Sequence, residues 1–252
     1  MKYLAEMTFA EVQEAAKEAV VLLPAAATEA HGPHLPLMTD VIIARAMATA
    51  GARALESRGF TLGVVAPPLQ WTPAAYAAGF PGTMSLSPAT ATAVLVDALM
   101  SFHRAGFSRI VIANAHLDPA HIASLNEGVS RAREAGAVVT FPDITRKPWA
   151  LRLTDEFKSG ACHAGQFETS VVMAERPDLV RESIRVGLEP NPASLSDAIR
   201  AGKATFEAAG GPEAYFGFPA KATAEEGLET LRILGEILAD AVVSDRDGGV
   251  TA

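Results

Sequence analysis

The sequence predicts an α/β fold in which helices cover both faces of a mainly parallel sheet, a three-layer α/β/α sandwich, with residues 1–252 forming a single domain. Three observations predict it. Of the 252 residues, 49% are hydrophobic and 20% are charged, which is typical of a globular protein. Short β-branched apolar runs alternate with alanine-rich helical stretches, as in βαβ units. No repeat or low-complexity linker divides the chain.

The expected strands are near-continuous apolar runs, as in strands that are covered on both faces. They span residues 20–26, 62–66, 109–113 and 137–141. Helices are expected at residues 40–57, 88–104, 119–135, 165–175, 194–209 and 224–243. Ser87-Pro88 supplies a capping residue and then proline at the first helical position, while Gly106 and Gly136 stand where helix C-caps are expected.

A turn-rich loop between residues 71 and 87 contains Gly79-Phe80-Pro81-Gly82 and is too long for a simple connection. Such a loop either lines a functional site or is an ordinary surface excursion.

Charge and cysteine content exclude several classes of protein. A net charge of −8 argues against a nucleic-acid partner, which needs a basic surface. The single cysteine, Cys162, cannot form an intramolecular disulfide, so a cytoplasmic location is expected. The amino terminus lacks the pattern of a signal peptide, and the longest apolar run, residues 19–27, is too short to cross a membrane.

Histidines are concentrated in three short stretches: residues 29–34, residues 114–121 and residues 162–165 contain five of the six. The first two stretches begin just after predicted strands. Because ligands bind at the carboxyl edge of open parallel sheets, these side chains are expected to converge there.

Each stretch also contains carboxylates at metal-ligand spacing. Glu29 precedes His31 by two residues, His116 precedes Asp118 by two, and Asp40 closes the first loop. Imidazole and carboxylate together suit zinc, manganese or iron, and one or two ions can be held if a carboxylate bridges them. In the third stretch, His163 is a candidate acid/base, and Glu168 adds a carboxylate five residues later.

Less specific interpretations remain open for single residues. Asp40 can cap the helix that follows it, Asp118 is a normal helix N-terminus before Pro119, and Glu168 can be a solvated helix residue. His31 or His34 alone can be a hydrogen-bonded loop histidine, and His103 and His121 are interpreted as structural. Cys162 is either a thiolate nucleophile or, more commonly, a small buried core residue.

Four segments resemble the creatininase (creatinine amidohydrolase) family. These are PAAATEAHGPHLPLMTD at residues 24–40, GFPGT at residues 79–83, Asn114-Ala115-His116, and HAGQFETS at residues 163–170. The resemblance implies a cytosolic, metal-dependent amidohydrolase with an α/β fold, commonly a homohexamer built from dimers. It further implies that His163 is the general acid/base and that Glu168 is either a further metal ligand or the residue that orients His163. The implied metal ligands are Glu29, His31, Asp40, His116 and Asp118. Of these, Asp40 would bridge two ions.

Two departures from the family pattern argue against creatinine itself as the substrate. Leu117 replaces an aromatic residue that touches substrate in creatininase, and Cys162 replaces an acidic residue. We therefore expect a metal-activated water to cleave a C–N bond of a small, cyclic amide or a formamide. The alternatives are a hydrolase of a lactone or cyclic keto-sugar, a peptidase, and a metal-bearing scaffold without turnover. Predicted substrate contacts are Gly82, Thr83, Asn114, Leu117 and Trp149.

Overall fold

The computed structural model describes residues 1–246, and its centre is a five-stranded, all-parallel sheet with the strand order β1-β3-β2-β4-β5. The strands are β1 (Lys2–Tyr3), β2 (Ala19–Ala25), β3 (Leu62–Val65), β4 (Arg109–Asn114) and β5 (Val139–Thr140). The four predicted strands are confirmed, although β5 is only two residues long. The short edge strand β1 was not predicted.

The central strand β2 shows why these runs are continuously apolar. Val21 and Leu23 pack into the core on one face of the sheet, and Val20 and Leu22 pack into the core on the other. All four side chains are at most 2% exposed. Alternation along the strand therefore supplies both cores at once.

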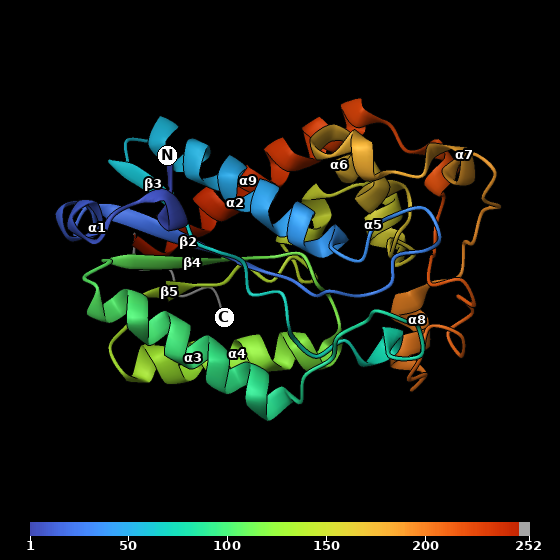
Figure 1. Cartoon of the computed structure of the whole chain (residues 1–252), viewed down its shortest axis with the longest axis horizontal. Coiled ribbons are helices and arrows are strands. Elements are labelled where there is room, and N and C mark those ends of the chain that lie inside the picture. Colours follow the sequence, from blue (N-terminus) through green and yellow to red (C-terminus); the bar gives the residue numbers. More distant parts are fainter. Residues whose placement is uncertain (247–252) are drawn as a thin grey trace.

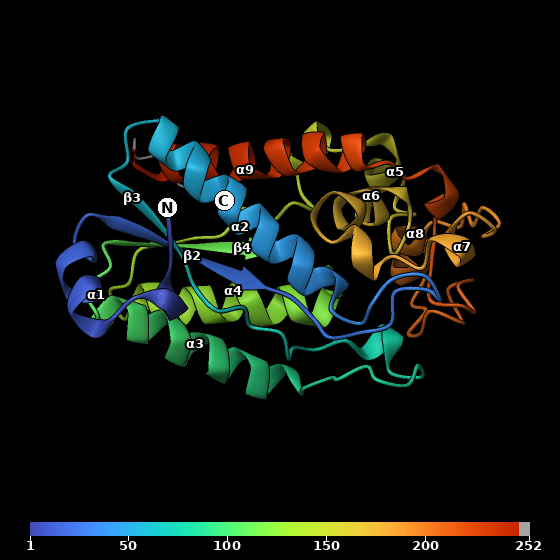
Figure 2. The same ribbon diagram turned by 45° about the horizontal axis from the view of Figure 1, so that its top comes forward.

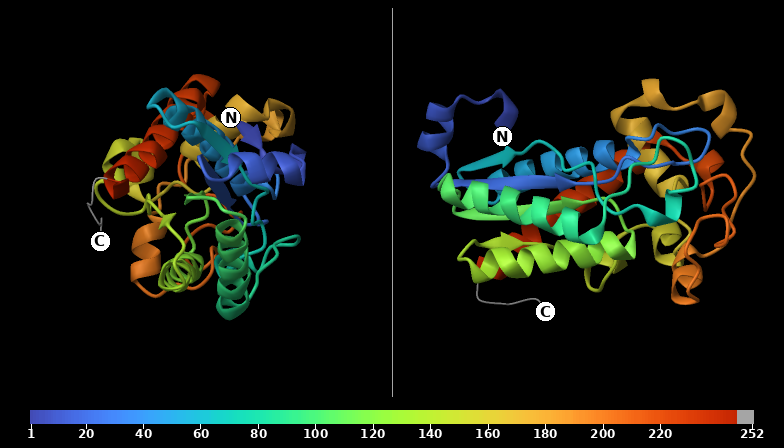
Figure 3. Two further views of the ribbon diagram at one scale, coloured as in Figure 1. Left: turned by 90° about the vertical axis from the view of Figure 1, so that its left-hand side faces the viewer. Right: turned by 60° about the horizontal axis from the view of Figure 1, so that its bottom comes forward.

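Helices cover both faces, which confirms the predicted three-layer fold (Figures 1 and 3). One face carries α2 (Thr39–Ser57) and α9 (Ala224–Arg246), and the other carries α1 (Phe9–Ala15), α3 (Pro88–Arg104) and α4 (Pro119–Glu134). The predicted cap is present: the Ser87 side chain accepts the N–H of Thr90, and Pro88 begins α3. Within residues 1–246, no helix is long and apolar enough to cross a membrane.

Shorter elements gather at the carboxyl end of the sheet (Figure 2). They include α5 (Asp155–Ser159), α6 (Gln166–Glu175), α7 (Glu182–Arg185) and α8 (Leu195–Arg200), and the 3₁₀ turns η2 (Ala75–Ala77), η4 (Pro177–Leu179) and η5 (Pro219–Lys221). Two further 3₁₀ turns lie elsewhere: η1 (Leu4–Glu6) follows β1, and η3 (Trp149–Arg152) lies beside α9, where Arg152 pairs with Glu236 and Asp240. Helix α6 corresponds to the one predicted at residues 165–175.

The helix predicted over residues 194–209 is wrong beyond Arg200. Gly202 adopts a φ of +78°, and its N–H donates to the carbonyl of Ile199, which ends α8 with a left-handed residue. The chain then turns, and Phe206 enters a separate apolar cluster with Ala30 and Ala161. Apolar spacing alone did not distinguish this anchored segment from a continued helix.

Candidate metal centre and active site

The ends of two neighbouring strands bring the first two histidine stretches together. Strands β2 and β4 pair in parallel register up to Ala25 and Asn114. Glu29 and His31 follow β2, and His116 follows β4. All three side chains are buried, with no more than 3% of each exposed. The three side chains therefore meet at the carboxyl edge of the sheet, as the sequence predicted.

Asp40 lies at the centre of this cluster. Its Oδ1 is 3.0 Å from His31 Nε2, and its Oδ2 is 3.0 Å from His116 Nδ1. Met38 occupies the N-cap position of α2, so Asp40 belongs to the first helical turn and does not cap it. The side chain instead turns inward between the two histidines.

The start of α6 adds the third stretch. Glu168 Oε2 lies 3.5 Å from His31 Nε2 and accepts the N–H of Ala164 at 2.6 Å. His163 Nδ1 lies 4.0 Å from Glu29 Oε1. Ala164, between them, adopts a φ of +50°, an uncommon conformation for a residue with a side chain. The tight turn at Ala164 thus directs both His163 and Glu168 toward the strand-end residues.

These six residues form three overlapping groups whose ligand atoms lie within 4.8 Å of one another. The groups are Glu29, Asp40 and His116; His31, Asp40 and Glu168; and Glu29, His31 and His163. Within the described part of the chain, His31 Nε2 and Asp40 Oδ2 are buried without a hydrogen bond of normal geometry. Because buried polar atoms normally have partners, the set fits divalent cations with mixed nitrogen and oxygen ligands.

Each histidine of the cluster has one ring nitrogen bound to a backbone carbonyl. His31 Nδ1–H donates to Glu29 O at 3.1 Å, His116 Nε2–H to Pro73 O at 2.8 Å, and His163 Nε2–H to Ala30 O at 3.0 Å. The other nitrogen of each ring faces the carboxylates. Such outer bonds fix the orientation of metal-binding imidazoles.

Electrostatics show that the carboxylates need positive charge. Burial lowers the pKa of His31, but the neighbouring Asp40, Glu168 and Glu29 carboxylates outweigh it and raise that pKa to about 10. Burial, reinforced by Asp40 and Glu29, raises the pKa of Glu168 to about 8, although the positive charge of His31 opposes the shift. Protons on His31 and His116, whose pKa values the neighbouring carboxylates raise, provide this balance, and bound cations would provide it equally well.

Asp118 and Asn114 lie beside the cluster in supporting positions. Asp118 is the N-cap of α4, where Oδ1 accepts the N–H groups of Ala120 and His121, while Oδ2 is buried and has no hydrogen bond to any residue that the structure describes. Asn114 donates to His116 O and accepts both the His116 N–H and the His121 Nε2–H. The structure therefore places Asp118 outside the three groups, and the side chain of Asn114 fixes the turn at His116.

The other predicted substrate contacts lie on the loop at Gly82-Thr83 and against the core that includes α9. Thr83 Oγ1 accepts the N–H of Ala30 and so holds the loop that carries Glu29 and His31. Gly82 lies close to Leu37 of the same loop, because a Cβ at Gly82 would be 2.5 Å from Leu37 Cδ1. Leu117 and Trp149 are partly buried against the core beneath α9.

The remaining histidines and Cys162 take no part in the groups. His34 Nε2–H donates to Thr169 Oγ1 at 2.9 Å, and His103 is exposed at the end of α3. Burial, together with the charges of Glu168 and Glu156, holds the pKa of Cys162 well above its usual value. This shift opposes the thiolate needed for a cysteine nucleophile.

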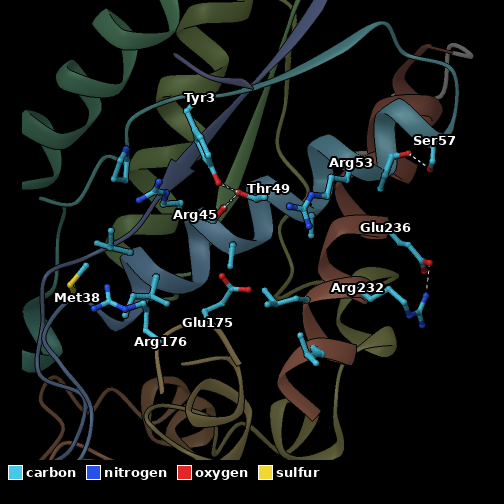
Figure 4. A pocket seen from close by; sticks show the side chains of 18 of the residues that line it. Tyr3, Met38, Arg45, Thr49, Arg53, Ser57, Glu175, Arg176, Arg232 and Glu236 are labelled. Carbon is cyan, nitrogen blue, oxygen red and sulfur yellow. Dashed lines mark hydrogen bonds and ion pairs between the residues drawn. The ribbon is translucent and has the colours of Figure 1, made fainter. Parts of the chain in front are cut away.

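A separate groove of about 1020 Å³ runs along the outer side of α2 (Figure 4). Arg45 stacks over the ring of Tyr3, and Arg232 pairs with Glu229 and Glu236. None of the six clustered residues lines this groove. The six buried residues of the cluster lie instead at the carboxyl edge of the sheet.

The α/β fold and the cluster of candidate metal ligands fit a metal-dependent hydrolase. The family model for creatininase, creatinine amidohydrolase, matches residues 5–242. The chain therefore belongs to the creatininase family, as its motifs predicted.

Two curated relatives are similar to this chain over most of its length. The chain is 33% identical over 209 residues to a mycofactocin precursor peptide peptidase of Mycolicibacterium smegmatis, covering 82% of this chain and 78% of the relative. It is 30% identical over 198 residues to the creatinine amidohydrolase of Pseudomonas putida, covering 71% and 73%.

Solved structures agree with the fold. The structure named creatininase Mn has a TM-score of 0.73 at 25% identity, over 96% of this chain and 98% of that one. A mutant creatininase of Zn-Zn type has a TM-score of 0.72 at 25% identity, over 96% and 97%.

Sequence reasoning missed three features of the site. The carbonyl of Pro73 holds His116 but has no side-chain signal, and Ala30 O holds His163 in the same way. Phe206, whose ring centroid lies 4.3 Å from that of His163, was hidden in a predicted helix. Gly202, four residues before Phe206, was the available signal that the helix ends.

Proposed function

We propose that this protein hydrolyses the C–N bond of an amide, using two divalent cations that share Asp40. The observation that carries the proposal is the placement of the two Asp40 oxygens. Oδ1 faces His31 and Oδ2 faces His116, so one carboxylate joins two ligand groups. Zinc, manganese or iron held there would acidify a water molecule and polarise the amide carbonyl.

The clustered residues would hold the two ions and transfer the proton. Glu29 and His116 would hold one ion, and His31 and Glu168 the other, and Asp118, whose Oδ2 has no hydrogen bond among the described residues, would be a further ligand. His163 would take a proton from the attacking water on Nδ1 and pass it to the leaving nitrogen. Its Nε2–H is already bound to Ala30 O, and burial, assisted by the charge of His31, lowers its pKa well below the usual value. The neutral ring that results has Nδ1 free to accept.

For the substrate, we propose a small cyclic amide or a formamide, held by Leu117, Trp149, Asn114 and the loop at Gly82-Thr83. A peptide is the second candidate, because the relative at 33% identity is a peptidase. Creatinine amidohydrolase and peptidase both cleave C–N bonds, which favours this bond over the ester bond of a lactone or a ring bond of a cyclic keto-sugar.

We also propose that the protein works in the cytoplasm as a homo-oligomer, with a hexamer built from dimers as the expected form. Exposed apolar side chains on the two site loops, including Leu37, Trp71 and Met84, support burial against another copy.

The first test is turnover with and without metal. A panel of cyclic amides, formamides, short peptides and lactones is incubated with chelated protein and with protein reloaded with Zn²⁺ or Mn²⁺. We expect hydrolysis only after reloading, with one new amino group formed per turnover, which stays on the opened ring when the substrate is a cyclic amide. Activity that survives complete metal removal, or a product without a new amine, would contradict the proposal.

His163→Ala separates metal binding from proton transfer. Because His163 is assigned the proton, the variant is expected to keep its metal content and to lose at least about 100-fold in kcat. His103→Ala, which removes an exposed histidine on α3, is the matched control and should leave both unchanged. Wild-type turnover in His163→Ala would remove that residue from the mechanism.

A further inference from the structure

The imidazole of His163 packs between a metal-site histidine and a phenylalanine. Its ring centroid lies 4.3 Å from that of His31 and 4.3 Å from that of Phe206, with interplanar angles of 36° and 37°. Phe206 is buried and lies 43 residues after His163 in the chain. The contact is therefore made by the fold and not by local sequence.

Phe206 is itself fixed by the turn-rich loop at residues 71–87. Its N–H donates to Tyr76 O at 3.0 Å, and the Tyr76 hydroxyl donates to Lys203 O at 2.6 Å. The rings of Tyr76, Phe80 and Phe216 lie 6.2, 6.4 and 5.8 Å from the Phe206 ring. We call these four aromatic residues, Tyr76, Phe80, Phe206 and Phe216, the aromatic cap.

The aromatic cap also contacts the main chain at His163. The N–H of Phe216 donates to His163 O at 2.7 Å, so one end of the cap fixes the backbone of His163 while Phe206 packs against its ring. The side chain is further restrained by the hydrogen bond of its Nε2–H to the Ala30 carbonyl and by the ring of His31.

A single neutral hydrogen bond favours one ring orientation by only about fivefold. If the His163 ring turned over, Nε2 would leave Ala30 O and Nδ1 would no longer face the Glu29 carboxylate. Packing against Phe206 restricts the plane of the His163 ring, and in that plane Nε2–H reaches Ala30 O while Nδ1 faces Glu29. Phe206 therefore supplies a substantial part of what keeps Nδ1 directed at the cluster.

We infer that Phe206 is a positioning residue, whose ring holds His163 in the one orientation that directs Nδ1 at the metal cluster. The catalytic consequence rests on the proposed function, in which His163 carries a proton. The orientation of the His163 ring does not depend on the proposed function.

The test compares Phe206→Leu with Phe206→Tyr in the zinc-loaded protein. Leucine keeps apolar bulk without an aromatic face, and tyrosine restores the ring. Phe102→Leu is the matched control, because it removes one ring of the Phe102–Phe107 pair in the opposite layer, far from His163 along the chain. Three quantities are measured: metal content, kcat and KM on an amide from the panel, and the protonated ring nitrogen of His163 by ¹⁵N NMR.

We expect Phe206→Leu to lower kcat about tenfold or more, with KM changed less than about threefold and metal content unchanged. The NMR signal of His163 should change from a single Nε2–H form to a mixture of both forms. Phe206→Tyr should restore both readouts, and Phe102→Leu should alter neither.

Each contrary result has a distinct meaning. A single Nε2–H form in Phe206→Leu overturns the inference, whatever happens to kcat, and so does a loss of kcat that merely follows a loss of zinc. If wild-type protein hydrolyses no amide while Phe206→Leu shows mixed ring forms, the proposed function fails and the positioning role stands.

Discussion

The imidazoles of His31, His116 and His163 share one bonding arrangement, a backbone carbonyl on one nitrogen and a carboxylate near the other. The acceptors are Glu29 O, Pro73 O and Ala30 O. This arrangement leaves a definite nitrogen of each ring, Nε2 of His31 and Nδ1 of the other two, for a metal ion or a proton. The choice between the nitrogens is therefore made by the outer hydrogen bonds.

His34 supports the site from a buried position and makes a testable contribution to stability. Its Nε2–H donates to Thr169 Oγ1, and its Nδ1 is buried with no hydrogen bond among the described residues. Burial, assisted by the charges of His31 and Arg185, lowers the pKa of His34 from 6.5 to about 4. A proton on Nδ1 would be a buried donor without an acceptor.

Because the unfolded chain binds this proton more readily, the free energy of unfolding should decrease as the pH falls from 6.5 toward 4, by up to about 3 kcal/mol. His34→Gln keeps a donor for Thr169 and does not titrate, so its urea-unfolding curves should depend less on pH over that range. Equal pH dependence in the two metal-loaded proteins would exclude the contribution of His34.

Side-chain chemistry made much of the site predictable, and individual aspartates show the limit. Sequence alone left Asp40 and Asp118 each as a possible ligand or helix cap. In the structure Asp118 is the cap of α4, and Asp40 turns into the cluster from the first turn of α2. Both lie at helix starts, so only packing around the side chain distinguishes them.

At the scale of elements, α6 delivers Glu168, and a second buried carboxylate holds the start of that helix. Glu156, on α5, accepts the N–H groups of Gln166 and Phe167 in the first turn of α6 and the N–H of Phe218, at 2.6–2.9 Å. These bonds replace a conventional cap, because Gly165 has no side chain to provide one.

Glu156→Gln is expected to lower the free energy of unfolding by about 2 to 3 kcal/mol, because an amide nitrogen would then face a backbone N–H. Glu175→Gln, at the exposed end of the same helix, is the control and should change it by less than about 0.5 kcal/mol. Urea unfolding at pH 8 measures both. A loss in Glu156→Gln no larger than that of the control would contradict the capping role.

Secondary structure was predicted best where caps and periodicity agree, as in α3, with Ser87 and Pro88 at its start. It failed for residues 201–209, where apolar residues continue but Gly202 reverses the chain. The two-residue edge strand β1 was also missed, because Lys2 and Tyr3 pair with β3 through backbone atoms alone.

At the scale of the whole molecule, the parallel sheet explains why two of the three histidine stretches could be placed from sequence. Strands β2 and β4 are neighbours, so the loops that follow them meet at one edge. His163 and Glu168 follow no strand. They reach the cluster because α6 packs against both α2 and α9, where Val171 contacts the apolar group containing Val41 and Leu231. No sequence pattern predicted that packing.

The central claim is that one carboxylate, Asp40, joins two metal ions in this fold. Crystals grown with Mn²⁺ or Zn²⁺ test it directly through anomalous scattering. We predict two anomalous peaks per chain, about 3.5 to 4 Å apart, with Asp40 Oδ1 bound to one and Oδ2 to the other. A chain with no peak in the cluster, or with a single ion that Asp40 does not contact, would contradict the account.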